Sequence, residues 1–137
     1  MNLEGNITSK RIINVFSHMV ADMKPWIMLL NNEPVPENIE CMPSWSIQQC
    51  RDELNEVNTK INRIISTLDT VELKNTVNSQ GKNGKVFTHT VSEILTQIAS
   101  HNQYHRGQIE MLIKDETDID MRTIYMSYLR DQQPSLK

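Results

Sequence analysis

The sequence predicts a small all-α protein built as a bundle of amphipathic helices. Its 137 residues suit one domain, and we expect that domain to span residues 1–137. Three long stretches carry apolar residues at steps of three and four, which is the spacing of one face of an α-helix. The hydrophobic fraction of 38% is modest but sufficient for one core.

The first helix is expected over residues 9–30, with Thr8 or Ser9 as its N-cap. Its apolar positions are Ile12, Ile13, Phe16, Met19, Val20, Met23 and Ile27. Pro25 should kink this helix or mark a weak turn, because proline removes one backbone donor. Residues 31–43 hold three prolines and therefore predict a loop.

The second helix is expected over residues 46–68, capped by Ser44 or Ser46. Its apolar positions are Ile47, Cys50, Leu54, Val57, Ile61, Ile64, Ile65 and Leu68. Residues 69–90 are polar and contain two glycines between short stretches of β-forming residues. They predict a loose β-hairpin or a long loop.

The third helix should begin after a cap at Thr90 or Ser92 and end near Lys114. A final segment, residues 118–131, has apolar residues at helical spacing. We expect a short helix there that packs across the bundle.

Two histidines on the third helix carry the strongest chemical signal. His101 and His105 are four residues apart, so they stand one above the other on the same helix face. That face is apolar on either side, with Ile94, Leu95, Ile98, Ile109 and Leu112. A histidine on such a face is more often a core residue with a hydrogen-bond partner. His18, however, lies near the middle of the first helix, and three imidazoles can hold one divalent transition metal ion.

The residues around these histidines limit the chemistry. Asn102 stands where the H-E-x-x-H motif of metalloproteases has its glutamate base, so that motif is absent. Three protein ligands would leave an open position for water or substrate. Asp22 follows His18 by one helical turn and either lines the metal pocket or pairs with a lysine or arginine.

The other candidate residues have simpler interpretations. His89 follows the glycine-rich stretch and is expected to be an exposed loop histidine. Cys41 and Cys50 lack metal-ligand spacing, and Cys50 fits the apolar stripe of its helix. With no visible signal peptide, two cysteines indicate reduced thiols and a cytoplasmic protein.

Charge and hydropathy exclude two classes of partner. The formal net charge is −3 and the basic residues are scattered, which argues against nucleic acid. The longest apolar run, Trp26 to Leu30, is far too short to cross a membrane.

Residues 101–108 read His-x-x-x-His-Arg-Gly-Gln, which resembles the hallmark helix of the DinB superfamily. This DNA-damage-inducible family includes YfiT-like proteins and thiol S-transferases. His18, followed by an apolar stretch and Trp26, is similar to the family's earlier histidine element, and the resemblance runs from about Asn6 to Leu129. It implies an up-down-down-up four-helix bundle with nickel or zinc held by His18, His101 and His105. Arg106 and Gln108 would then make hydrogen bonds around the site, and Gly107 would permit close approach of a helix or substrate.

The resemblance also implies a function. Characterised relatives attach low-molecular-weight thiols, such as bacillithiol or mycothiol, to electrophiles, so the expected partners are a small thiol and an electrophile. The catalytic residues stay unknown. The alternative is a non-catalytic metal-binding or stress-response bundle that acts through oligomerisation or a protein partner.

The chain departs from the family in one respect. Relatives usually carry a helix before the one with the first histidine, whereas about eight residues precede it here. We expect that N-terminal helix to be missing or very short. The C-terminal segment or a second subunit would then complete the bundle, and a homodimer is the expected assembly.

Overall fold

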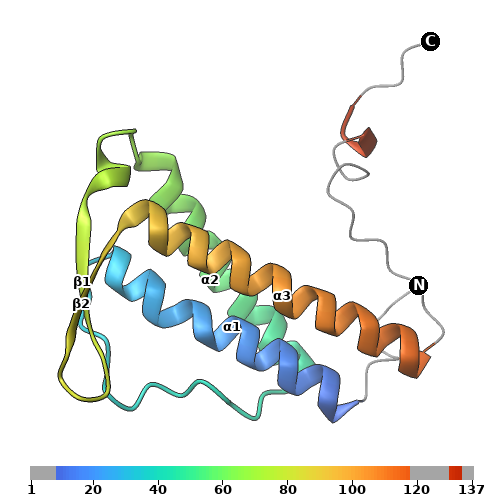
Figure 1. Ribbon diagram of the computed structural model, residues 1–137. Coiled ribbons are helices and arrows are strands. Elements are labelled where there is room, and N and C mark those ends of the chain that lie inside the picture. Colours follow the sequence, from blue (N-terminus) through green and yellow to red (C-terminus); the bar gives the residue numbers. More distant parts are fainter. Residues whose placement is uncertain (1–8, 118–129, 134–137) are drawn as a thin grey trace.

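Three long helices dominate the computed structural model, which describes residues 9–117 and 130–133 (Figure 1). They are α1 (Lys10–Leu30), α2 (Ile47–Thr67) and α3 (Val91–Thr117). Between α2 and α3 lie the short 3-10 helix η2 (Glu72–Lys74) and the strands β1 (Thr76–Gln80) and β2 (Val86–Thr90). The chain is therefore mostly helical, as expected, but it is not all-α.

The helices α1 and α2 run in the same direction, and α3 runs against both (Figure 1). A long crossover between α1 and α2 returns the chain along the length of the bundle, which makes the parallel pair possible. Since α1 packs against both α2 and α3, it is the central helix of this arrangement. The last three helices of an up-down-down-up bundle have the same order of directions, two parallel helices followed by one that runs against them. The four-helix bundle itself stays a prediction.

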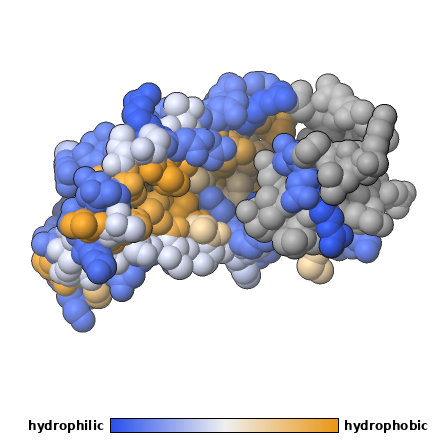
Figure 2. All heavy atoms as spheres, turned by 90° about the horizontal axis from the view of Figure 1, so that it is seen from above, coloured by the Kyte–Doolittle hydropathy of each residue, from blue (hydrophilic) through white to orange (hydrophobic). Residues whose placement is uncertain are grey.

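The core lies where α1 meets the other two helices. Buried apolar side chains come from all three helices; they are Met19, Val20, Met23, Ile27, Val57, Ile94 and Ile98. The apolar stripe of α2 is the least covered, because only Cys50 and Val57 on it are buried and Ile65 is 51% exposed. One face of the molecule also carries a band of apolar side chains between polar rims (Figure 2).

Local hydrogen bonds explain where the helices begin. Ser46 caps α2 through a capping box with Gln49, in which each side chain accepts from the other residue's backbone N–H. Ser9 precedes α1 but makes no capping hydrogen bond with its side chain. Of the two alternatives expected at Pro25, the turn is absent, since α1 is one helix from Lys10 to Leu30, and the kink stays a prediction. Proline removes only one backbone hydrogen bond, and the apolar residues on either side of it are buried in the core.

The polar stretch before α3 forms a two-stranded antiparallel sheet, the hairpin alternative of the sequence prediction. Thr76 pairs with Thr90 at one end and Gln80 with Val86 at the other. The backbone of Gly84 has a φ of 72°, a conformation that glycine adopts without strain, and it closes the turn. His89 lies in β2 rather than in a loop and is half-buried, with its ring edge-on to Trp26 at 6.1 Å. The prediction of an exposed loop histidine was therefore wrong.

Two further expectations concern the C-terminal part. The third helix continues to at least Thr117, about one turn beyond the predicted Lys114, and an ion pair between Arg11 and Glu116 joins this part of α3 to α1. The expected last helix, residues 118–131, falls almost wholly outside the described residues. Across the part of the chain that is described, no helix combines the length and hydropathy needed to cross a membrane.

Candidate metal centre

The packing of α1 against α3 brings three histidines together. His18 comes from the middle of α1, and His101 and His105 come from successive turns of α3. One nitrogen from each ring lies within 4.8 Å of the other two. The ring centroids are 4.4 Å apart for His101 and His105, and 5.0 and 5.7 Å from His18 to His105 and His101. The structure thus assembles the three histidines that the sequence singled out.

The cluster sits at the edge of the core. His105 is only 9% exposed, while His18 and His101 are half-buried. Beside it, the side-chain amide of Asn102 donates to the sulfur of Met23 at 3.3 Å, which connects α3 to α1 next to the site. The burial of His105 and the partial burial of the other two rings limit their freedom to move.

Hydrogen bonds to the outer ring nitrogens orient two of the three histidines. His18 Nδ1 lies 2.7 Å from the backbone carbonyl oxygen of Cys41, and His105 Nδ1 lies 2.7 Å from Gln108 Oε1. These oxygens only accept hydrogen bonds, so each Nδ1 carries the proton and donates it. The lone pair is left on Nε2, which is the arrangement of a histidine that binds a metal.

The inner nitrogens face one another. His101 Nε2 lies 3.1 Å from His105 Nε2 and 3.0 Å from Asp22 Oδ2. Burial lowers the pKa of His101, and the neighbouring His105 and His18 lower it further, whereas Asp22 opposes the shift. The neutral imidazole, which is the form that binds metals, is therefore favoured at this position.

The donor set fits a divalent transition metal. Two ligand atoms that share one ion at bond lengths of about 2.1 Å are about 3.0 to 3.4 Å apart. The 3.1 Å separation of the two Nε2 atoms on α3 falls in that range. Neutral imidazoles suit zinc, nickel, copper and iron. The three histidines could therefore bind a divalent transition metal ion.

Two residues around the site behave as expected. Gln108 makes its hydrogen bond to a histidine, and Asp22 lines the site, although its partner is His101 rather than a lysine or arginine. At Gly107 no helix of the described residues approaches closely, because a Cβ there would meet nothing within 4 Å, and the alternative, approach of a substrate, stays a prediction.

The two cysteines have separate environments. Cys50 is completely buried, with its sulfur 3.1 Å from Ser17 Oγ, and burial raises the pKa of its thiol. It is a core residue, as its place on the apolar stripe indicated. Burial also raises the pKa of the Cys41 thiol, and Asp22 raises it further by its charge and a hydrogen bond. Cys41 therefore borders the site, which the sequence gave no reason to expect.

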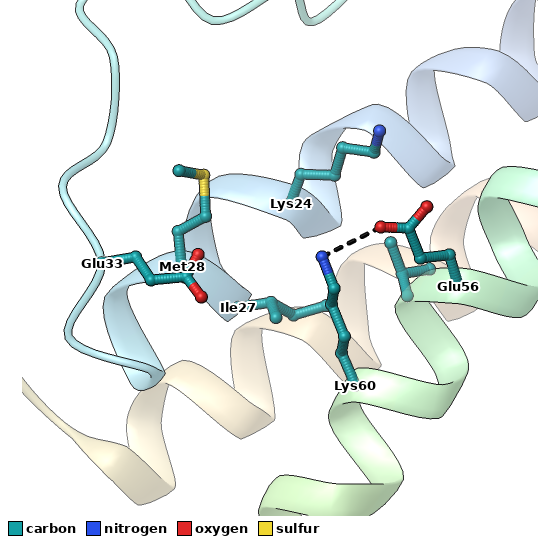
Figure 3. Close-up of a pocket in the computed structure, with 7 residues that line it drawn as sticks. Lys24, Ile27, Met28, Glu33, Glu56 and Lys60 are labelled. Atoms are coloured by element: carbon teal, nitrogen blue, oxygen red, sulfur yellow. Dashed lines mark ion pairs between the residues drawn. The ribbon is translucent and has the colours of Figure 1, made fainter.

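A small cavity elsewhere does not belong to this centre. It encloses about 150 Å³ between α1 and α2 and is lined by Lys24, Ile27, Met28, Glu33, Glu56, Val57 and Lys60 (Figure 3). Ile27 follows His18 by two and a half helical turns, which places the two on opposite faces of α1. Lys60 and Glu56 in this cavity pair with each other at 3.0 Å, so their charges are already satisfied.

Comparison with known protein families finds a match, and that match includes all three histidines. The model of a family described as the DinB family matches residues 4–132, which is nearly the whole sequence. Searches of curated proteins and of solved structures found no match to this chain.

Proposed function

The chain belongs to the DinB family, and from this membership and its three converging histidines we propose a divalent-metal-dependent enzyme that transfers a low-molecular-weight thiol to an electrophile. The observation that carries the proposal is the convergence of three imidazole nitrogens within 4.8 Å. Nickel and zinc are the proposed metals, since both bind imidazole well.

The residues of the chain have distinct roles in this proposal. His18, His101 and His105 hold the ion, and the Cys41 carbonyl and Gln108 orient two of them. When bound, the ion lowers the pKa of a coordinated thiol, so that the thiol is a thiolate near neutral pH. No glutamate base is needed for this chemistry, which agrees with Asn102 at the position where metalloproteases have one.

A second candidate is a non-catalytic metal-binding bundle that acts through another protein. Two large side chains on α3 favour it, because Tyr104 and Met111 are 65% and 69% exposed. They lie seven residues apart and thus on the same face of the helix.

Metal analysis of protein purified without a histidine tag tests the centre itself. We expect one equivalent of a divalent transition metal, and His105→Ala should lose it. That variant should still fold, because α1 and α3 also meet through buried apolar residues such as Val20, Met23 and Ile98. His89→Ala is the matched control, since it removes a histidine outside the cluster. Stoichiometric metal in His105→Ala, with its helical circular dichroism intact, would refute the assignment.

An activity assay then separates the two candidates. The metal-loaded protein is incubated with several cellular thiols and a simple electrophile, beside His101→Ala and the His89→Ala control. Faster thiol consumption by wild type and His89→Ala than by His101→Ala supports the transferase. Equal background rates for all three proteins would leave the non-catalytic bundle as the better description.

A further inference from the structure

A carboxylate reaches the inner side of the histidine cluster. Asp22 lies one helical turn beyond His18 on α1, and its Oδ2 is 3.0 Å from His101 Nε2. This nitrogen is the one that faces His105. Asp22 therefore contacts His101 from the metal side and not through the outer nitrogen.

We propose that Asp22 is a fourth, anionic ligand, which makes the centre a three-histidine, one-carboxylate site. The inference rests on the proposed metal binding and extends it. Without metal, His101 Nε2 can donate a hydrogen bond to Asp22. An ion on Nε2 takes the place of that proton, so the carboxylate loses its donor and faces a cation instead.

The spacing agrees with direct coordination. Ligand atoms at right angles on one ion, with bonds of about 2.1 Å, are about 3.0 Å apart. The separations from His101 Nε2 to Asp22 Oδ2 and to His105 Nε2 are 3.0 and 3.1 Å. Within the described residues no lysine or arginine pairs with Asp22, whose side chain is 30% exposed. Its negative charge is thus available to the ion.

The loop between α1 and α2 orients a ligand of the same centre. The Cys41 carbonyl oxygen lies 2.7 Å from His18 Nδ1, which leaves Nε2 of that histidine for the ion.

Cobalt loading of the full chain tests the proposal, with Asp22→Asn compared with wild type. Affinity is measured by competition with a chelator, and the visible absorption reports the ligand set of the ion. We expect Asp22→Asn to bind cobalt at least about 10-fold more weakly, because an anionic ligand is lost, and to shift the absorption bands. Asp22→Ala is measured in the same way, in case the asparagine oxygen itself binds the ion.

Asp52→Asn is the matched control, because it removes an equal charge from an exposed position on α2. It should reproduce the wild-type affinity and spectrum. Stoichiometric binding by both Asp22 variants with the wild-type spectrum would overturn ligation by Asp22 and leave the three-histidine centre intact, even if the affinity fell. Absence of cobalt binding by wild type would overturn both.

Discussion

At the scale of single residues, Gln108 orients His105 through a short hydrogen bond to the outer ring nitrogen of that histidine. Its Oε1 accepts from His105 Nδ1 at 2.7 Å, while its Nε2 donates to the hydroxyl of Tyr104 at 3.2 Å. The second bond ties the other end of the amide to Tyr104, whose hydroxyl oxygen accepts it. The Tyr104 hydroxyl thus helps to set the orientation of His105.

We predict that Gln108→Ala weakens metal binding by about 10- to 100-fold without removing a ligand, because residues that orient ligands typically have effects of that size. Chelator competition with the cobalt-loaded protein measures the change. Gln103→Ala, at an exposed position of the same helix, serves as the control. Equal affinity in the two variants would contradict the orienting role.

That His18, His101 and His105 come together could be predicted from sequence, because helical spacing decides which face each histidine occupies. His101 and His105 share a face whatever the tertiary structure, and His18 lies beside the apolar positions that must pack inward. Cys41 could not be predicted in the same way. Its contribution to His18 is a backbone carbonyl, which every residue has, and its position depends on the path of a loop with no periodic pattern.

At the scale of elements, the start of α3 depends on a reciprocal pair at the end of β2. The N–H of Glu93 donates to Thr90 Oγ1 at 3.1 Å, and the N–H of Thr90 donates to Glu93 Oε2 at 2.7 Å. These bonds satisfy donors that the first helical turn leaves unpaired. These two hydrogen bonds therefore fix the residue at which β2 ends and α3 begins.

We predict that Thr90→Ala lowers the free energy of unfolding by about 0.5 to 2 kcal/mol, the usual effect of losing a threonine N-cap. Urea denaturation followed by circular dichroism measures it. Thr96→Ala is the comparison, because Thr96 is exposed inside the same helix and alanine has the higher helix propensity. A loss in Thr96→Ala as large as that in Thr90→Ala would show that the cap contributes nothing.

Glu93 makes the same cap sensitive to acid. The hydrogen bond from the Thr90 backbone N–H lowers the pKa of Glu93 below its ordinary value of 4.5. A lowered folded-state pKa means that this contribution is fully present above pH 4.5 and is lost as the pH falls through the folded-state pKa. The stability difference between wild type and Glu93→Ala should therefore shrink as the pH is lowered from neutral to below that value.

The sequence predicted the helices better than the hairpin, because helices depend on interactions between residues that are close in sequence. Ser46 and Thr90 were each one of two predicted caps, and in the structure each accepts a hydrogen bond from a backbone N–H only three residues away. The pairing of Thr76 with Thr90 joins residues fourteen positions apart. Such pairing depends on contacts that no local pattern encodes, so the hairpin was only one of two alternatives.

At the scale of the molecule, the crossover between α1 and α2 has two consequences. It allows α1 and α2 to run parallel (Figure 1), and it brings the Cys41 carbonyl oxygen to within 2.7 Å of His18 Nδ1. The helix directions agree with the expected bundle topology. The partner that would cover the open stripe of α2 could not be deduced from one chain, because an apolar stripe does not specify what packs on it.

We predict that the protein is a homodimer in solution. The apolar band in Figure 2 and the exposed Tyr104 and Met111 provide surface whose burial between two copies is favourable. Light scattering at micromolar concentration should give a mass near twice the chain mass of 15.9 kDa. Met111→Glu should shift the equilibrium toward monomer, because a charge would be buried at the interface, whereas Asn62→Glu on an exposed position of α2 should not. A wild-type mass near that of one chain would refute the dimer, and identical masses for wild type and Met111→Glu would place its interface away from this face of α3.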